Sequence, residues 1–317
     1  MQGFLVRRSL LLAPTLFLAS VVIFAIITLA PGDPVRMMLG TQATPAEIAQ
    51  ERARLGLDRP VPVRYFIWMM HVSRLDLGRS QVNNQPVATL VLKAFPYTLR
   101  LTAGALAISV LIGFAIGILA ALQQNRLTDL VLTGLASLGL AVPSFWLGIL
   151  LILLFSVTLR WLPPSGVAES GAPSLATLKY LVMPVITVAV SNLSVFSRFV
   201  RTAMLEVLTA HYIRTARAKG LNERVVVAHH ALRNALIPVV TILGIQFGRL
   251  LGGALVTEAV FAYPGIGRLV VTSILNRDYP MVQATLMLVV LIFLAANTIV
   301  DISYAYLDPR LKVGAAR

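Results

Sequence analysis

The feature that most constrains this chain is a series of long apolar runs. The first run, residues 9–30, holds 22 residues without a single charge. A helix rises about 1.5 Å per residue, so this run is long enough to cross a hydrocarbon layer roughly 30 Å thick. Lipid offers no partner to backbone polar groups, and nothing in the runs alternates like a transmembrane strand. The sequence therefore predicts an all-α polytopic membrane protein.

Six membrane-spanning helices are expected, at residues 9–30, 101–122, 130–159, 181–200, 235–260 and 281–307. Pro143 and Pro238 are expected to bend or start helices. A signal peptide is the alternative interpretation of the first run. Its apolar region would be only about 7 to 15 residues long, and Pro31 is a poor residue after a cleavage site, so we expect an uncleaved anchor.

The composition agrees with a membrane protein. Hydrophobic residues make up 57% of the chain and charged residues 13%, against roughly 25% charged in soluble domains. The chain has no cysteine, which excludes disulfides, thiolate metal sites and cysteine nucleophiles. The net charge of +14 fits basic membrane connections better than nucleic-acid binding, so no nucleic-acid partner is expected.

The lysines and arginines between the runs predict the orientation. If the N-terminus (1–8) is cytoplasmic, 12 basic residues fall in the inner segments, which are 1–9, 123–129, 201–233 and 308–317. Only 4 fall in the short outer segments, 159–180 and 262–280. The outer segment 31–97 is long enough to be largely exempt from this bias. Both termini, including the tail 309–317, are therefore expected in the cytoplasm.

The long outer segment 31–97 is expected to contain short helices. Thr44 and Glu47 form a capping-box pattern with Pro45 at the first helical position, and Gly56 follows as a stop. A second helix is expected from about Val63 to Leu75. This segment could be a folded cap on the outer face or a docking surface for an external partner.

The inner segment 201–233 is the most polar part of the second half of the chain. Its pattern predicts a helix from Ala203 to Lys219, a stop at Gly220, and a second short helix capped by Asn222. Apolar residues stand among its charges, so the segment needs a surface to lie against. That surface could be the membrane domain of the same chain or a cytoplasmic partner.

Motifs for ATP binding, zinc binding and nucleophilic catalysis are absent from the sequence. There is no G-x-x-x-x-G-K-[ST] phosphate loop, no H-E-x-x-H zinc motif and no G-x-S-x-G motif. The neighbouring histidines His229 and His230 point in different directions on a helix, so no metal site is expected. We expect no catalytic residue here and an energy source in another subunit.

Several segments together resemble the permease subunit of ABC importers in the dipeptide, oligopeptide and nickel branch. They are APGDP at 30–34, LGLDRPVPVRY at 55–65, LDLGRS at 75–80, YIRTARAKGLNERVVVAHHALRNALIP at 212–238, and EAVFAYPGIGRLV with NRDYP within 258–280. The usual inner-loop pattern is E-A-A, then three intervening residues, then glycine. Here Arg214, Thr215 and Ala216 precede Gly220, so only Ala216 and Gly220 match it.

The resemblance implies a type I permease fold with its core at 98–308, in the bacterial cytoplasmic (inner) membrane. It implies a second homologous permease, two cytoplasmic ATPase subunits that bind ATP and magnesium, and an external substrate-binding protein. No cofactor is expected on this chain. The implied substrate is a di- or oligopeptide, with nickel or another small solute as the alternative; a self-contained secondary carrier and an intramembrane enzyme are further alternatives. The residues expected to couple to the ATPase are Tyr212, Arg214, Thr215, Ala216, Lys219, Gly220, Asn222 and Glu223.

Several residues within the runs also ask for an explanation. Gly244, Gly248 and Gly252 form one stripe of small residues, and Gly113 and Gly117 form another; each stripe could pack against a helix of this chain or of a partner. A central arginine is costly in lipid, so Arg249 is expected to face protein or water. Arg249 could line the transport pathway with Gln246, clamp two helices, or reach the outer surface. Glu258 is the third pathway candidate.

Overall fold

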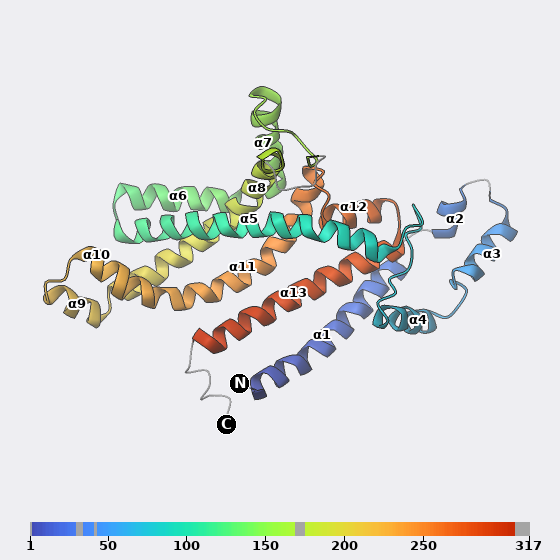
Figure 1. The fold of residues 1–317 in the computed structure, drawn as a ribbon, viewed down its shortest axis with the longest axis horizontal. Coiled ribbons are helices and arrows are strands. Elements are labelled where there is room, and N and C mark those ends of the chain that lie inside the picture. Colours follow the sequence, from blue (N-terminus) through green and yellow to red (C-terminus); the bar gives the residue numbers. More distant parts are fainter. Residues whose placement is uncertain (1, 30–33, 41–42, 169–174, 308–317) are drawn as a thin grey trace. The chain divides into compact units, whose positions relative to one another are not determined.

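The protein is built from α-helices in the computed structural model (Figure 1). The structure describes residues 2–29, 34–40, 43–168 and 175–307, and no strand occurs in these ranges. The all-α architecture predicted from the apolar runs is therefore confirmed.

The helices have the following bounds in chain order: α1 (Gln2–Leu29), α2 (Pro34–Leu39), α3 (Pro45–Arg54), α4 (Val61–Ser73), α5 (Val87–Leu122), α6 (Leu127–Ala141), α7 (Ser144–Leu151), the π-helix η1 (Ile152–Thr158), α8 (Leu175–Leu208), α9 (His211–Ala218), α10 (Glu223–Val225), the π-helix η2 (Val226–Ala231), α11 (Leu232–Val260), α12 (Ile266–Leu275) and α13 (Tyr279–Leu307).

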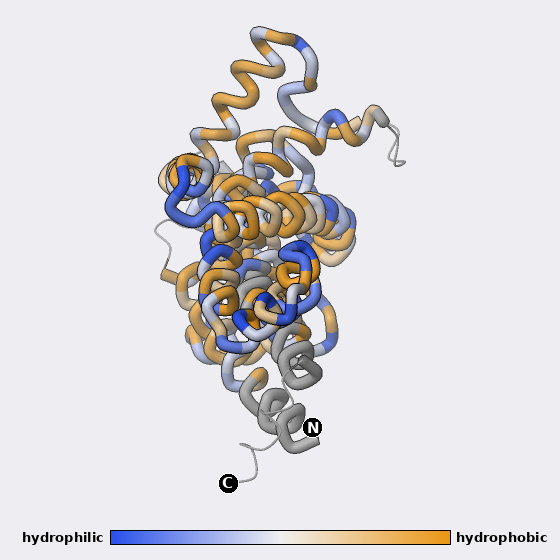
Figure 2. Tube along the Cα trace, turned by 90° about the vertical axis from the view of Figure 1, so that its left-hand side faces the viewer, coloured by the Kyte–Doolittle hydropathy of each residue, from blue (hydrophilic) through white to orange (hydrophobic). Residues whose placement is uncertain are grey.

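Four helices are long and apolar enough to cross a membrane among the described residues. Their candidate spans are Leu12–Leu29, Val87–Leu122, Ala176–Leu208 and Tyr279–Ile299. In Figure 2 the helices are mostly coloured hydrophobic, and hydrophilic residues gather in the connections. Helix α11 covers the predicted span 235–260, but it includes residues whose side chains lie outside the described set. The total of six spans stays a prediction.

The expected span 130–159 is not one helix. Helix α6 ends at Ala141 and α7 begins at Ser144. The helix axis bends by 99° between Leu127–Ala141 and Ser144–Thr158. Between them Val142 is extended, with φ −77° and ψ 121°. Proline lacks the backbone N–H and pushes the preceding residue out of the helical region, which explains the break at Pro143. Counted as one bent span, the pair raises the number of candidates to five.

The chain divides into two compact units. The first comprises Met1–Val6, Tyr97–Arg268 and Phe293–Arg317, and the second comprises Arg7–Pro96 and Leu269–Ile292. In the first unit, α8 packs against both α6 and α11. Phe196 and Met204 of α8 are buried in one apolar cluster, and Val188 of α8 is buried with Leu250 of α11 in another.

The second unit contains the predicted short helices of the long outer segment. The side chain of Thr44 accepts from the amide of Glu47 and the carboxylate of Glu47 accepts from the amide of Thr44, so the capping box at the start of α3 is confirmed. Gly56 follows α3 with φ +64°. The second helix, α4, begins and ends two residues earlier than predicted. Residues 30–33 of the APGDP motif and the tail 308–317 lie outside the described residues.

Candidate functional site

A short helical hairpin joins α8 to α11 in the first unit. The sequence predicts one helix over 203–219, but α8 continues to Leu208 and a new helix, α9, begins at His211. Between them Ala210 is extended, with φ −65° and ψ 146°. The hydroxyl of Thr209 donates to the carbonyl of Glu206 at 2.8 Å, which satisfies an acceptor in the last turn of α8. The prediction of an unbroken helix was therefore wrong.

The turn after α9 has the predicted stop and cap. Gly220 has φ +78°, and a Cβ at this position would meet no atom within 4 Å. Glycine is required here by the backbone conformation rather than by crowding. The side chain of Asn222 accepts from the amide of Arg224 at 3.0 Å and caps α10. The stop at Gly220 and the cap at Asn222 are confirmed.

One face of the hairpin is buried in the first unit. Ile213 and Ala216, three residues apart on α9, are 0% and 7% exposed, and they share an apolar cluster with Val226 of η2 and with Phe196 and Met204 of α8. Residues three apart lie on the same side of a helix. The membrane domain of the same chain therefore supplies the surface for this face.

The rest of the hairpin surface is exposed and mixes apolar with charged residues. Tyr212 is 44% exposed, Leu221 40% and Val225 45%. The other predicted coupling residues on this exposed side are Arg214, Thr215, Lys219, Gly220, Asn222 and Glu223. Ala216 is the exception among the predicted residues, because it packs inward.

An ion pair, which sequence analysis did not identify, closes the hairpin. Nη2 and Nε of Arg217 donate to the two carboxylate oxygens of Glu223 at 2.6 and 3.0 Å. Hydrogen bonding to Arg217 lowers the pKa of Glu223. The two residues are six apart across a glycine turn, a spacing for which helical periodicity gives no signal.

Glu258, at the end of α11, is fully buried and holds the start of α12. Its carboxylate accepts from the hydroxyl of Thr98 and from the amide of Gly267, each at 2.6 Å, and from the amide of Arg268 at 3.3 Å. The amide of Ile266 donates in turn to the Thr98 hydroxyl at 2.8 Å. Helix N-termini present unpaired amides and favour an anion. In this structure the pathway candidate Glu258 is a helix cap.

The glycines of the EAVFAYPGIGRLV motif allow this cap to form. A Cβ at Gly265 would overlap the carboxylate of Glu258, and a Cβ at Gly267 would overlap the backbone of Leu255. Backbone atoms cannot move aside as a flexible side chain can. The close approach of α12 to α11 therefore requires glycine at position 267.

The other two pathway candidates lie on α11. Gln246 is 4% exposed, and its amide donates to the side-chain oxygen of Asn192 on α8 at 3.3 Å. This contact is a polar link between two helices. Arg249 is one of the residues of α11 whose side chains lie outside the described set.

The two predicted glycine stripes differ in their surroundings. A Cβ at Gly113 would lie 3.0 Å from the carbonyl of Leu193, and one at Gly117 would lie 2.6 Å from the carbonyl of Ser197. Gly113 and Gly117 thus let α5 approach α8 of the same chain. A Cβ at Gly252 would meet nothing within 4 Å, whereas Gly244 and Gly248 lie outside the described side chains.

An ion pair joins α6 and α8, and sequence analysis did not predict it. Nε and Nη2 of Arg201 each donate to a different carboxylate oxygen of Asp129 at 2.7 Å. Asp129 also accepts from the amide of Asn125 at 3.0 Å and from the hydroxyl of Thr133 at 3.2 Å. The only sequence signal is an acidic residue in the first turn of a helix, which is common.

Comparison with known proteins extends over nearly the whole chain. Residues 113–313 match the family model described as binding-protein-dependent transport system inner membrane component, and residues 1–102 match the model for the N-terminal part of such membrane components. The glutathione transport system permease protein GsiC of Salmonella choleraesuis (strain SC-B67) is 43% identical over 312 residues, covering 98% of this chain and 99% of GsiC. GsiC of Escherichia coli (strain K12) is 41% identical with the same coverage.

Two groups of solved structures share the fold. A chain of the inward-facing MetNI methionine ABC transporter has a TM-score of 0.59 at 19% identity, covering 70% of this chain and 98% of the transporter chain. A chain of an amino acid ABC transporter has a TM-score of 0.52 at 15% identity, covering 69% and 94%. At these identities the likeness concerns the fold alone.

Proposed function

The chain belongs to the binding-protein-dependent transport system inner membrane component family of ABC importer permeases, and we propose that it forms half of a translocation pathway for short peptides. The other half is a second, homologous permease. Two cytoplasmic ATPase subunits supply the energy, and an external binding protein delivers the substrate. The match to GsiC over 98% of the chain carries the choice of substrate class, because glutathione is a tripeptide.

The substrate class is tested by uptake into vesicles that contain the assembled importer. We expect ATP-dependent uptake of short peptides, with tripeptides of glutathione size as the first to be measured. Nickel uptake is measured in the same vesicles. Uptake of nickel without any uptake of peptide would contradict the proposed substrate.

The hairpin over 212–224 is the proposed element that docks in an ATPase cleft. The division between its buried and exposed residues supports this role. Ile213 and Ala216 tie it to the membrane domain, while Tyr212 and the residues around Gly220 remain exposed. A movement of the ATPase is thereby passed to helices α8 and α11.

Replacement of Gly220 tests the coupling role, and Gly166 provides a matched control. Both glycines have positive φ, +78° and +88°, and both have open space where a Cβ would be. A leucine at either site carries a similar strain, of about 1–2 kcal/mol. Gly220→Leu should lower transport and transport-coupled ATPase activity with normal membrane insertion, whereas Gly166→Leu should leave both activities near wild type. Equal activity of the two variants would exclude the docking role.

Both termini are proposed to lie in the cytoplasm. Reporter fusions after residues 60 and 215 test this orientation, because the first lies in the outer segment and the second in the hairpin. Labelling from opposite sides of the membrane is expected. Labelling from the same side would overturn the topology.

A further inference from the structure

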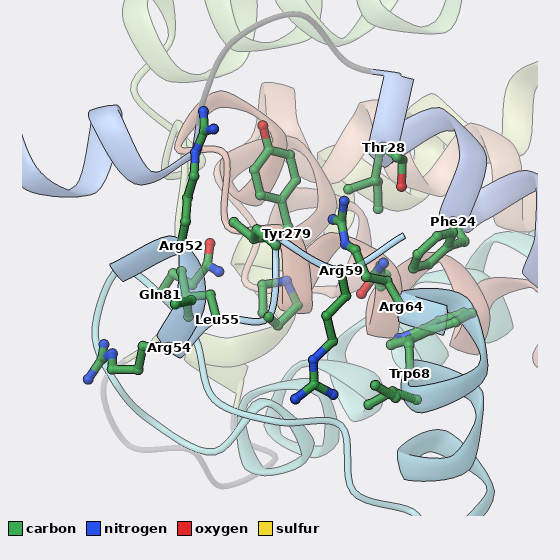
Figure 3. Close-up of a pocket in the computed structure, with 17 residues that line it drawn as sticks. Phe24, Thr28, Arg52, Arg54, Leu55, Arg59, Arg64, Trp68, Gln81 and Tyr279 are labelled. Carbon is green, nitrogen blue, oxygen red and sulfur yellow. The ribbon is translucent and has the colours of Figure 1, made fainter. Parts of the chain in front are cut away.

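A cavity of about 700 Å³ lies within the second unit (Figure 3). Its walls come from the last turns of α1, from the end of α3 and the chain that joins it to α4, from α4 itself, from Gln81, and from the first turns of α13. Phe24 and Thr28 contribute from α1, Trp68 from α4 and Tyr279 from α13. Four segments that are distant in sequence thus line one space.

The wall of this cavity is cationic. Arg52, Arg54, Arg59 and Arg64 line it, and among the residues that the structure describes no aspartate or glutamate does. Arg54 is paired with Glu51 at 2.6 Å. Arg59 and Arg64 make no ion pair within the part of the chain that the structure describes. Positive charges that share a concave surface create a potential that attracts anions.

Arg64 is the most enclosed of these cations. It is half-buried, and its guanidinium lies 6.0 Å from the centre of the Phe24 ring. Figure 3 shows its side chain extending between Tyr279 and Thr28. Burial lowers the pKa of Arg64, because water solvates the charged guanidinium less well there. A bound anion would offset the free-energy cost of this lost solvation.

Two candidate membrane spans meet the cavity at their ends, so we expect it at the edge of the hydrocarbon layer. The candidate span Leu12–Leu29 ends beside it, and the candidate span Tyr279–Ile299 begins beside it. Tryptophan and tyrosine are enriched at this depth in membrane proteins, and Trp68 and Tyr279 both line the cavity. The anion present at this depth along the whole bilayer is the phosphate of the phospholipids.

We propose that this cavity binds the phosphate headgroup of an anionic phospholipid, with Arg59 and Arg64 as cationic partners.

The test measures how tightly the purified, assembled importer binds phosphatidylglycerol after delipidation, by native mass spectrometry. Each arginine near a bilayer surface strengthens anionic lipid binding by about fivefold. Arg59→Gln and Arg64→Gln should therefore each weaken binding about fivefold, and the double variant about 25-fold. Arg74→Gln is the matched control, because Arg74 is an exposed arginine of the same unit that does not line the cavity.

Three further arms make the outcome decisive. The wild-type complex should bind phosphatidylglycerol more tightly than phosphatidylcholine, and this preference should disappear in the double variant. Inorganic phosphate and a short anionic peptide should fail to displace the lipid at millimolar concentration. Displacement by either one, or a double variant that binds like Arg74→Gln, would overturn the proposal. Arg59→Gln alone keeps the test valid if the double variant unfolds, because Arg59 is exposed.

Discussion

Breaking the ion pair between Asp129 and Arg201 should destabilise the first unit by about 2–3 kcal/mol. The side chain of Asp129 is 7% exposed and that of Arg201 is 26% exposed. Removal of one partner from a buried pair costs about 3–5 kcal/mol, whereas exposed pairs contribute about 1 kcal/mol or less. Water still reaches part of Arg201, which places this pair between the two limits.

A double-mutant cycle measures this cost. Asp129→Asn keeps the size of the side chain and an acceptor for the amide of Asn125, but it removes the charge that the guanidinium needs. Arg201→Gln removes the other partner. Each single variant should lose about 2–3 kcal/mol, and the double variant should lose less than their sum by about 1–2 kcal/mol.

The assay is reversible unfolding of the purified chain in mixed detergent micelles, followed by circular dichroism. Wild type, both single variants and the double variant are compared at one pH and one salt concentration. Costs that add to within about 0.5 kcal/mol would show that the two side chains do not stabilise each other. That result would refute the reasoning from geometry and burial.

Three further outcomes are expected. Gly267→Ala should prevent stable assembly, because its Cβ would overlap the backbone of α11. Gly134→Ala, at an open position of α6 outside both glycine stripes, should assemble normally, and recovery of the purified complex after expression measures both. The ion pair between Arg217 and Glu223 should protect the amides of α9 from hydrogen exchange at neutral pH, relative to Glu223→Gln. Hydrogen bonding to Arg217 lowers the pKa of Glu223, so the carboxylate stays charged down to acidic pH. This protection should fall away as the pH drops below about 4, where Glu223 becomes protonated. Arg249→Gln should alter peptide uptake with near-normal assembly, and unchanged uptake by a fully assembled complex would exclude a pathway role.

The sequence predicted those parts of the fold that depend on local chemistry. Thr44 and Glu47 begin α3, Pro143 breaks the third apolar run, and Gly220 ends the hairpin helix, each through constraints that act within a few residues. Helix limits were less accurate. Helix α5 begins 14 residues before the predicted start at 101, because its first turns carry Lys93 and a proline and do not stand out as an apolar run.

The parts that could not be predicted depend on contacts between distant residues. Asp129 and Arg201 are 72 residues apart, and Thr98 and Glu258 are 160 apart. A single sequence gives no signal for which of many polar residues will meet. The bonds that join the carboxylate of Glu258 to the start of α12 could therefore not be predicted, and the pathway role of Glu258 stays a prediction.

The close packing around α8 determines how stiff the first unit is. Val200 shares a buried cluster with Ile213 of α9, and a Cβ at Gly117 of α5 would lie 2.6 Å from the Cβ of Val200. Protein interiors packed this closely have few voids and low compressibility. Helix α8 is therefore packed without free space against the hairpin and against α5. We therefore expect a small displacement of the hairpin to move α8 and α5 with it, because no void between these helices can take up the movement.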